Sequence, residues 1–279
     1  MGEEALIQCT LCHHGCRLAP GDVGFCRSRT NRNGTIKPLG YGCLTSLALD
    51  PIEKKPLARF HPGSLILSAG SFGCNFRCPF CQNHTISQRG REVTQTCLTP
   101  AELASLAVKL AREEGNVGLA FTYNEPLISL EYVRDTASLI KKAGLLVVLV
   151  TNGGIRPKPF TTLLPLVDAM NIDLKGFSNA FYEWVGGNLD DVKENIRSAC
   201  QAGIHVELTT LVIPGRNDGP DEMEAEASWI ASLSPTIPLH LSRYFPRWHC
   251  SDPMTPDATL LALQRIAKRH LQYVYLGNW

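Results

Sequence analysis

Three cysteines on one short stretch are the residues with the clearest chemical potential. Cys74, Cys78 and Cys81 stand in a C-x3-C-x2-C spacing within GCNFRCPFCQN, directly after an apolar run over 65–72. Thiolates this close in sequence fit one compact metal site. Zinc would need a fourth ligand, which Cys97 or His84 could supply. A four-iron cluster held by three thiolates would instead leave one iron with an open, reactive position.

A second set of four cysteines lies in the N-terminal segment CTLCHHGCRLAPGDVGFC, in a C-x2-C-x3-C-x9-C spacing with several glycines for tight turns. This pattern predicts a closed all-sulfur site, to which zinc and an auxiliary iron–sulfur cluster are equally suited. His13 or His14 could replace a thiolate, and buried free thiols are the alternative. The predicted ligands are Cys9, Cys12, Cys16 and Cys26. Four further cysteines lack ligand spacing and are predicted to be small apolar residues: Cys43, Cys97, Cys200 and Cys250.

Composition limits the classes of partner and compartment. The 279 residues include eleven cysteines and carry a formal net charge of +1, with no run of Lys and Arg. We therefore expect no nucleic-acid or membrane-surface partner. The start MGEEALIQC lacks a secretory pattern, and no apolar run reaches the roughly 18 residues of a membrane span. These features predict a cytoplasmic chain, in which clustered thiols serve as metal ligands.

Short β-branched runs alternate with helical patterns from residue 64 onward. Thr99 and Glu102 form a capping box that opens a helix ending near Gly115, and further helices are expected over 125–142, 188–202, 220–233 and from 255. The alternation predicts right-handed βαβ units and a parallel sheet, either doubly wound or a curved, incomplete barrel. Functional groups then belong at the carboxyl ends of the strands. The expected strands cover 65–72, 117–124, 145–152, 169–177, 204–215, 238–245 and 273–277.

Residues 1–60 differ from this pattern. They are expected to form a Cys-rich metal-binding module and a hairpin over 34–51, followed by a connector, while 61–279 form the α/β domain. Neither G-x-G-x-x-G nor the P-loop pattern occurs, which disfavours a nucleotide or NAD enzyme.

The C-x3-C-x2-C spacing, with Phe80 before the third cysteine and a preceding strand, resembles the radical S-adenosylmethionine (SAM) superfamily. The resemblance implies a [4Fe–4S] cluster on Cys74, Cys78 and Cys81. It also implies that SAM chelates the open iron and is cleaved reductively to a 5′-deoxyadenosyl radical, which abstracts hydrogen from a substrate. Phe80 and Asn83 are then expected to contact the cofactor. A structural zinc knuckle is the alternative.

Later strand ends extend the resemblance. Glu125 in TYNEP matches the acidic residue of a Gly-Gly-Glu-type motif that binds the SAM amino group, although Tyr and Asn replace the glycines. Its alternative role is a first-turn helix residue. Asn152 in VTNGG is expected near the SAM ribose, or in a simple turn. Asp173 and Lys175 share one strand face and are expected to meet SAM, or only each other. His240 is expected to face the cofactor cavity, with a buried structural histidine as the alternative.

The N-terminal cysteines, PIEKKPL (51–57) and YVYLGNW (273–279) narrow the resemblance to the AmmeMemoRadiSam-system radical SAM enzymes, relatives of pyruvate formate-lyase activating enzyme. This implies a partial (β/α)6 TIM-type barrel. It also implies a one-electron donor of flavodoxin or ferredoxin type, with Memo-type and AMMECR-type proteins as pathway partners. A glycyl-radical enzyme activase is the alternative enzyme. A zinc-stabilised binding module without catalysis is the alternative from another class.

Overall fold

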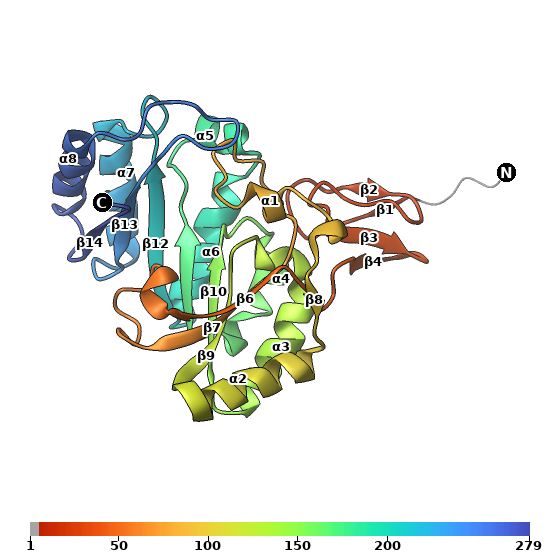
Figure 1. Ribbon diagram of the computed structural model, residues 1–279. Helices are drawn as coiled ribbons and strands as arrows, with labels where there is room; N and C mark the ends of the chain where they lie inside the picture. The colour runs from red at the N-terminus through yellow and green to blue at the C-terminus, as the bar shows by residue number, and fades with distance from the viewer. Residues whose placement is uncertain (1–5) are drawn as a thin grey trace.

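A curved, mostly parallel sheet forms the frame of the protein, whose computed structural model describes residues 6–279. The eight strands run in the order β14-β13-β12-β11-β10-β9-β7-β6, and all neighbours are parallel except β6 and β7. Because sequential strands lie side by side, right-handed crossovers place the connecting helices on one face. The sheet curves as an open barrel with edge strands β14 and β6 (Figure 1). The strands are β6 Ser46–Pro51, β7 Leu65–Gly70, β9 Asn116–Phe121, β10 Leu146–Thr151, β11 Ala169–Asp173, β12 His205–Val212, β13 Leu239–Arg243 and β14 Val274–Gly277.

The fold class and all seven strands expected from residue 64 onward are confirmed. The helix after Thr99 also begins and ends as predicted, because Thr99 and Glu102 form the reciprocal capping box and Gly115 ends the helix at a φ of 73°. The helices are α1 His84–Ser87, α2 Pro100–Glu114, α3 Leu130–Lys142, α4 Pro157–Thr161, α5 Asn179–Val185, α6 Leu189–Gln201, α7 Pro220–Leu233 and α8 Asp257–Ala267, with short 3-10 turns η1 Ile52–Lys54, η2 Arg91–Val93, η3 Pro126–Ser129 and η4 Leu164–Leu166. Among the described residues, no helix is long and apolar enough to cross a membrane.

The hairpin expected over 34–51 is wrong. The structure turns earlier, at Asn33-Gly34, where both residues have positive φ and join β3 (Arg29–Arg32) to β4 (Thr35–Pro38). An Asn-Gly pair of this kind forms the two-residue turn that suits a hairpin. β6 instead pairs antiparallel with β7 in the main sheet and so crosses the proposed domain division at residue 60. Two more short pairs complete the N-terminal part, β1 (Ile7–Gln8) with β2 (Arg17–Leu18) and β5 (Cys43–Leu44) with β8 (Thr96–Cys97). Residues 1–5 of the predicted module lie outside the described residues.

The connector over 52–60 packs against one face of the sheet. Ile52, Leu57 and Phe60 contact a small apolar cluster from four parallel strands, separate from the main core. Buried polar strand residues fix the connector: Asn171 Nδ2 donates to the carbonyl of Pro56, and Glu207 accepts from the backbone N–H groups of residues 58 and 59. The connector therefore covers the sheet face that the helices leave open.

Candidate active site

The loop over 71–83 carries the three spaced cysteines from the carboxyl end of β7 to α1. Cys78 is buried, whereas Cys74 and Cys81 are partly exposed. Gly73, just before the first cysteine of the loop, has a φ of 82°. A Cβ atom at Gly73 would lie 2.3 Å from the carbonyl oxygen of Cys26, so only glycine permits this approach between the loop and the N-terminal module.

Asparagine side chains tie this loop to the ends of β9 and β10. Asn75 Nδ2 donates to the carbonyl of Gly154 at 2.8 Å. Asn152 Nδ2 donates to Asn75 Oδ1 at 2.9 Å and lies 3.5 Å from Cys74 Sγ. On the other side, Asn83 Nδ2 donates to the carbonyl of Tyr123 at 2.7 Å. The predicted residues Asn83 and Asn152 thus both lie at the cysteine loop.

Two asparagines important to this arrangement were not predicted. Asn75 stands between the first two cysteines and is fully buried. Asn124 accepts from the N–H of Ser71 and donates to the carbonyls of Phe72 and Gly73, so it fixes the start of the loop. Their positions in the sequence could have indicated them: Asn75 lies inside the cysteine motif, and Asn124 follows the end of a strand. A buried amide side chain at such a position needs hydrogen-bond partners.

The thiols lie in a buried environment that disfavours their charged form. Burial raises the pKa of Cys78 to about 12, against a lowering by Lys175 and with further raising by Cys81 and Asp173. Burial also raises the pKa of Cys74, and Glu125 and Cys78 raise it further. These thiols therefore keep their protons until a metal replaces them. The charges of Glu125, Asp173 and Lys175 thus act on these thiols.

Glu125 is 2% exposed and accepts three hydrogen bonds. Thr151 Oγ1 and the N–H of Asn152 donate to its two oxygens at 2.7 Å each, and the N–H of Leu127 donates at 3.0 Å. Burial raises its pKa to about 7, although these hydrogen bonds lower it. The bond from Leu127 makes Glu125 the N-cap of η3, one position before the first turn in which the alternative role placed it. Its position beside Cys74 leaves a role toward a cofactor open as well.

Asp173 and Lys175 pair with each other at the end of β11. Lys175 Nζ lies 2.8 Å from Asp173 Oδ2, and their side chains are 16% and 35% exposed. Burial opposes the charge of Lys175, but Asp173, Cys78 and Cys74 together raise its pKa above the ordinary value. The pair therefore presents a stable cation beside the cysteine loop.

Two further predicted cofactor contacts, Phe80 and His240, pack against other side chains. The Phe80 ring is buried against Trp184, with centroids 5.3 Å apart. His240 Nε2 lies 2.6 Å from Glu207, and its ring stacks on Tyr275. None of the hydrogen bonds given for His240 reaches the cysteine loop. Its surroundings favour the alternative of a buried structural histidine.

The four N-terminal cysteines line one cavity of about 10 Å³, together with Leu11, Gly24, Phe25, Arg29 and Ile128. Backbone N–H groups point at their sulfurs, as Phe25 N does at Cys16 Sγ (3.4 Å). This module contacts the cysteine loop directly. His14 Nε2 bonds to the carbonyl of Asn75 at 2.8 Å, and Arg77 donates to the carbonyl of Phe25 at 2.6 Å.

The sulfur atoms of both cysteine sets are suitable metal ligands, but the thiols of neither set converge on one position. Over residues 6–279, no three Cys, His, Asp or Glu side chains converge on a single metal position. For the loop over 71–83, three thiols at the strand ends fit a four-iron cluster with one open iron.

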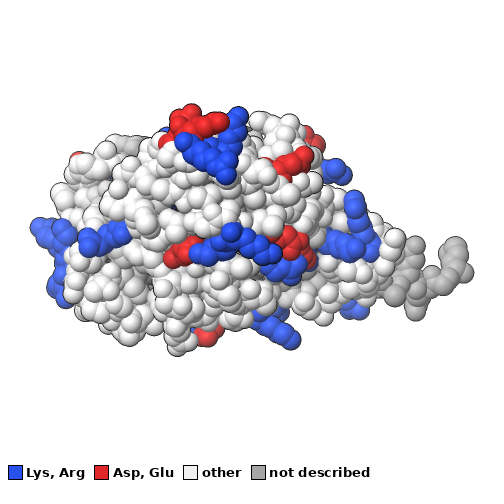
Figure 2. Space-filling view, turned by 90° about the horizontal axis from the view of Figure 1, so that it is seen from below, with Lys and Arg blue, Asp and Glu red and all other residues white. Residues whose placement is uncertain are grey.

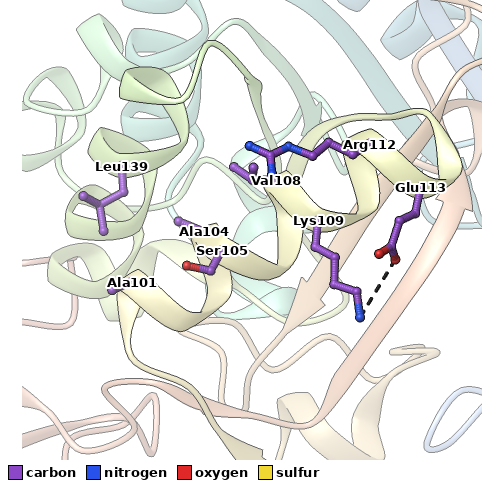
Figure 3. Close-up of a pocket in the computed structure, with 8 residues that line it drawn as sticks. All are labelled: Ala101, Ala104, Ser105, Val108, Lys109, Arg112, Glu113 and Leu139. Atoms are coloured by element: carbon purple, nitrogen blue, oxygen red, sulfur yellow. Dashed lines mark ion pairs between the residues drawn. The ribbon is translucent and has the colours of Figure 1, made fainter.

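A larger cavity, of about 550 Å³, lies elsewhere. It lies over α2 and includes Leu139 of α3, with an ion pair between Lys109 and Glu113 at 3.9 Å (Figure 3). None of its residues belongs to the cysteine loop or to a strand end. On the face seen in Figure 2, basic and acidic side chains lie side by side. The chemically equipped site is therefore the cysteine loop.

Fold and site together define an open α/β barrel that presents three thiols at the carboxyl ends of its strands. The family model described as "Radical SAM superfamily" matches residues 70–227, and the chain belongs to this superfamily. Its members are enzymes that use a [4Fe–4S] cluster and SAM and need a reductant. The family match assigns no substrate.

Individual relatives agree with this assignment. The chain is 38% identical over 280 residues to "Uncharacterized protein MJ0808" of Methanocaldococcus jannaschii, covering 99% of this chain and 82% of the relative. It is 27% identical over 154 residues to pyruvate formate-lyase 1-activating enzyme of Escherichia coli (strain K12), covering 53% of this chain and 61% of that enzyme. The structure of a radical SAM methyltransferase from Sphaerobacter thermophilus matches with a TM-score of 0.60 and 17% identity, over 78% of this chain and 67% of that chain. This last likeness shows the fold alone.

Proposed function

We propose that this chain cleaves SAM reductively at a [4Fe–4S] cluster bound by Cys74, Cys78 and Cys81. The cluster and SAM together would supply a 5′-deoxyadenosyl radical, which takes hydrogen from a substrate that the chain does not identify. One observation carries the proposal: the cysteine loop of a radical SAM family member stands at the carboxyl end of β7, fixed by buried asparagines from neighbouring strand ends.

The surrounding residues suit distinct tasks. Asn152, which bonds to Cys74, would orient this thiolate and contact the SAM ribose. Glu125 would accept a hydrogen bond from the SAM ammonium, because a carboxylate with three donors already in place is fixed in orientation. Lys175, held by Asp173, would attract the SAM carboxylate. The SAM carboxylate would then either replace Asp173 as the partner of Lys175 or bind Lys175 together with it.

The other parts of the proposal follow from the same chemistry. A one-electron donor of flavodoxin or ferredoxin type would reduce the cluster. The cytoplasm would provide the reducing environment that eleven thiols need. The connector over 52–60 would exclude water from the covered part of the sheet, so that the substrate approaches from the cysteine end. Memo-type and AMMECR-type proteins stay proposed as pathway partners.

We further propose a metal at the four N-terminal cysteines. The four thiols line one common cavity and could together close a tetrahedral site without an open position. Zinc with four thiolates is the first choice. Because the module bonds to Asn75 and Arg77, such an ion would stabilise the position of the cysteine loop.

A second candidate is activation of a glycyl-radical enzyme. It is favoured by the similarity to pyruvate formate-lyase 1-activating enzyme, which covers about half of this chain. The substrate would then be a backbone glycine of a partner protein. An EPR signal of a glycyl radical, formed in such a partner by this chain with SAM and reductant, would distinguish it from a small-molecule enzyme.

The test is anaerobic purification, iron, sulfide and zinc analysis, and EPR of the dithionite-reduced protein with and without SAM. We expect about four irons per chain, a reduced-cluster signal that SAM perturbs, and release of 5′-deoxyadenosine. Cys78→Ser should lose the signal and the product, while Cys200→Ser, a half-buried thiol outside the site, should keep both. Protein that binds zinc alone after anaerobic reconstitution would reduce the chain to a metal-stabilised binding module.

A further inference from the structure

Cys43 and Cys97 form a close thiol pair that the sequence spacing did not indicate. They were predicted to be separate small apolar residues, but β5 pairs antiparallel with β8 so that Cys43 stands directly opposite Cys97. Their sulfur atoms lie 3.4 Å apart. Cys43 is 3% exposed, whereas Cys97 is open to solvent. One thiol is thus accessible to small reagents, and the other lies behind it.

Backbone contacts hold the two thiols in this register. The N–H of Leu98 donates to the carbonyl of Gly42, and the N–H of Cys43 donates to Gly40, both at 2.9 Å or less. The cysteines therefore form a non-hydrogen-bonded cross-strand pair, in which opposing side chains come closest. Tyr132 Oη also donates to the carbonyl of Leu98 at 2.9 Å. The sulfurs need to approach by about 1.4 Å, through side-chain rotation, to reach bonding distance.

This pair is linked to the start of the cluster-binding loop. Ser71 Oγ donates to the carbonyl of Cys43 at 2.8 Å, and Thr45 Oγ1 donates to the carbonyl of Ser71 at the same distance. The N–H of Thr45 donates to Gly70 at the end of β7. Past the loop, the chain continues through α1 and η2 to β8, which contains Cys97 (Figure 1). A bond between residues 43 and 97 would enclose the whole cysteine loop in one covalent ring.

We propose that Cys43 and Cys97 are a thiol–disulfide modification site, closed by low-molecular-weight disulfides when the surroundings become oxidising. The Cys97 thiolate attacks one sulfur of oxidised glutathione and releases one glutathione thiolate. The Cys43 thiolate then attacks the Cys97 sulfur of the mixed disulfide and releases the second. Two cysteine thiols are oxidised, one glutathione disulfide is reduced to two thiols, and the two cysteine protons pass to the products.

The proposal does not depend on the substrate or on catalysis. Neither cysteine belongs to the C-x3-C-x2-C loop or to the N-terminal set of four. The ring between residues 43 and 97 restricts the unfolded chain, so the oxidised form should melt up to about 7 °C higher than the reduced form. The Cys97→Ser variant cannot form the bridge and should show no such increase.

The experiment equilibrates the anaerobically prepared, cluster-loaded full chain with glutathione buffers of rising oxidised fraction, followed by alkylation and peptide mass analysis. We expect a peptide pair linked through Cys43 and Cys97, absent in Cys97→Ser and retained in Cys200→Ser. Alkylated thiols at both positions in every buffer would overturn the proposal, as would a stable glutathione adduct on Cys97 without the cross-link. Because the readout is a mapped bond, loss of cluster or failure to cleave SAM leaves this test intact.

Discussion

Glu226 offers a direct test of the buried polar structure behind the site. This residue of α7 is 1% exposed and bonds to Thr210 Oγ1 of β12. The same hydroxyl lies 2.9 Å from the carbonyl of Leu174, between the paired Asp173 and Lys175. A hydroxyl has one proton. If Thr210 donates to Leu174, Glu226 must donate to Thr210 and is therefore protonated.

The pH dependence follows from this protonation. Burial raises the pKa of Glu226 to about 8 from 4.5, with Glu222 raising it further and the Thr210 bond lowering it. The folded chain thus holds a proton that the unfolded chain releases. The stabilising contribution is complete below pH 4.5 and is lost as the pH rises through about 8. This interval of pKa corresponds to about 5 kcal/mol, or about 8 °C in Tm for a chain of 279 residues.

Glu226→Gln keeps a donor for Thr210 but cannot ionise. We expect similar Tm values for variant and parent at pH 5, and a variant that melts about 8 °C higher at pH 9. Thermal unfolding followed by circular dichroism at pH 5, 7 and 9, with equal cluster loading, measures this difference. Glu224→Gln is the matched control, because Glu224 is an ion-paired residue of the same helix whose pKa is lowered by His270. A difference between Glu226→Gln and parent that does not change with pH would refute the reasoning.

Three further outcomes are expected. Gly73→Ala should lower both the Tm and the iron content, because the added Cβ would lie 2.3 Å from the carbonyl oxygen of Cys26 in the N-terminal module. Gly115→Ala is the control, since Gly115 also has a positive φ but no atom within 4 Å of an added Cβ. This variant should lose only about 1 kcal/mol of unfolding free energy in urea and should retain its iron. Glu207→Gln should lower the free energy of unfolding by up to about 3 kcal/mol at pH 7. That deficit should shrink as the pH falls toward about 2, because hydrogen bonds from two histidines and two backbone groups outweigh burial and lower the Glu207 pKa to about 2. Asn152→Ala should weaken iron retention against a chelator by about tenfold, since it removes the amide that orients the first cluster cysteine; unchanged retention would contradict this role.

Local patterns in the sequence predicted the elements well, because they depend on neighbouring residues. The capping box at Thr99 and the apolar runs of the parallel strands are signals of this kind. Which distant segments pair with each other was harder to predict, because no local pattern determines the partner of a strand. The apolar residues of 46–51 indicated a strand but not its partner in β7, and the hairpin predicted over 34–51 did not include the Asn33-Gly34 turn.

The candidate site shows the same limit. The cysteine spacing predicted one compact set of thiols, and Asn83, Asn152, Glu125, Asp173 and Lys175 do lie around it. The placement of His240 depended instead on Glu207, a residue of another strand whose carboxylate also binds the connector. The sequence of β13 alone therefore could not show the role of His240. Likewise, the Cys43–Cys97 pair is created by a register between segments separated by the entire cysteine loop.

The charge balance of the site links these observations. A cluster on the three thiolates would place negative charge where burial already raises the pKa of Cys74 and Cys78. Lys175 is the cation whose charge acts on both thiols, and Asp173 helps to keep it protonated. The lysine is therefore suited to stabilising the thiolates in addition to attracting a carboxylate. Removing this ion pair from water costs desolvation free energy, and a negatively charged cluster nearby would offset part of that cost for Lys175.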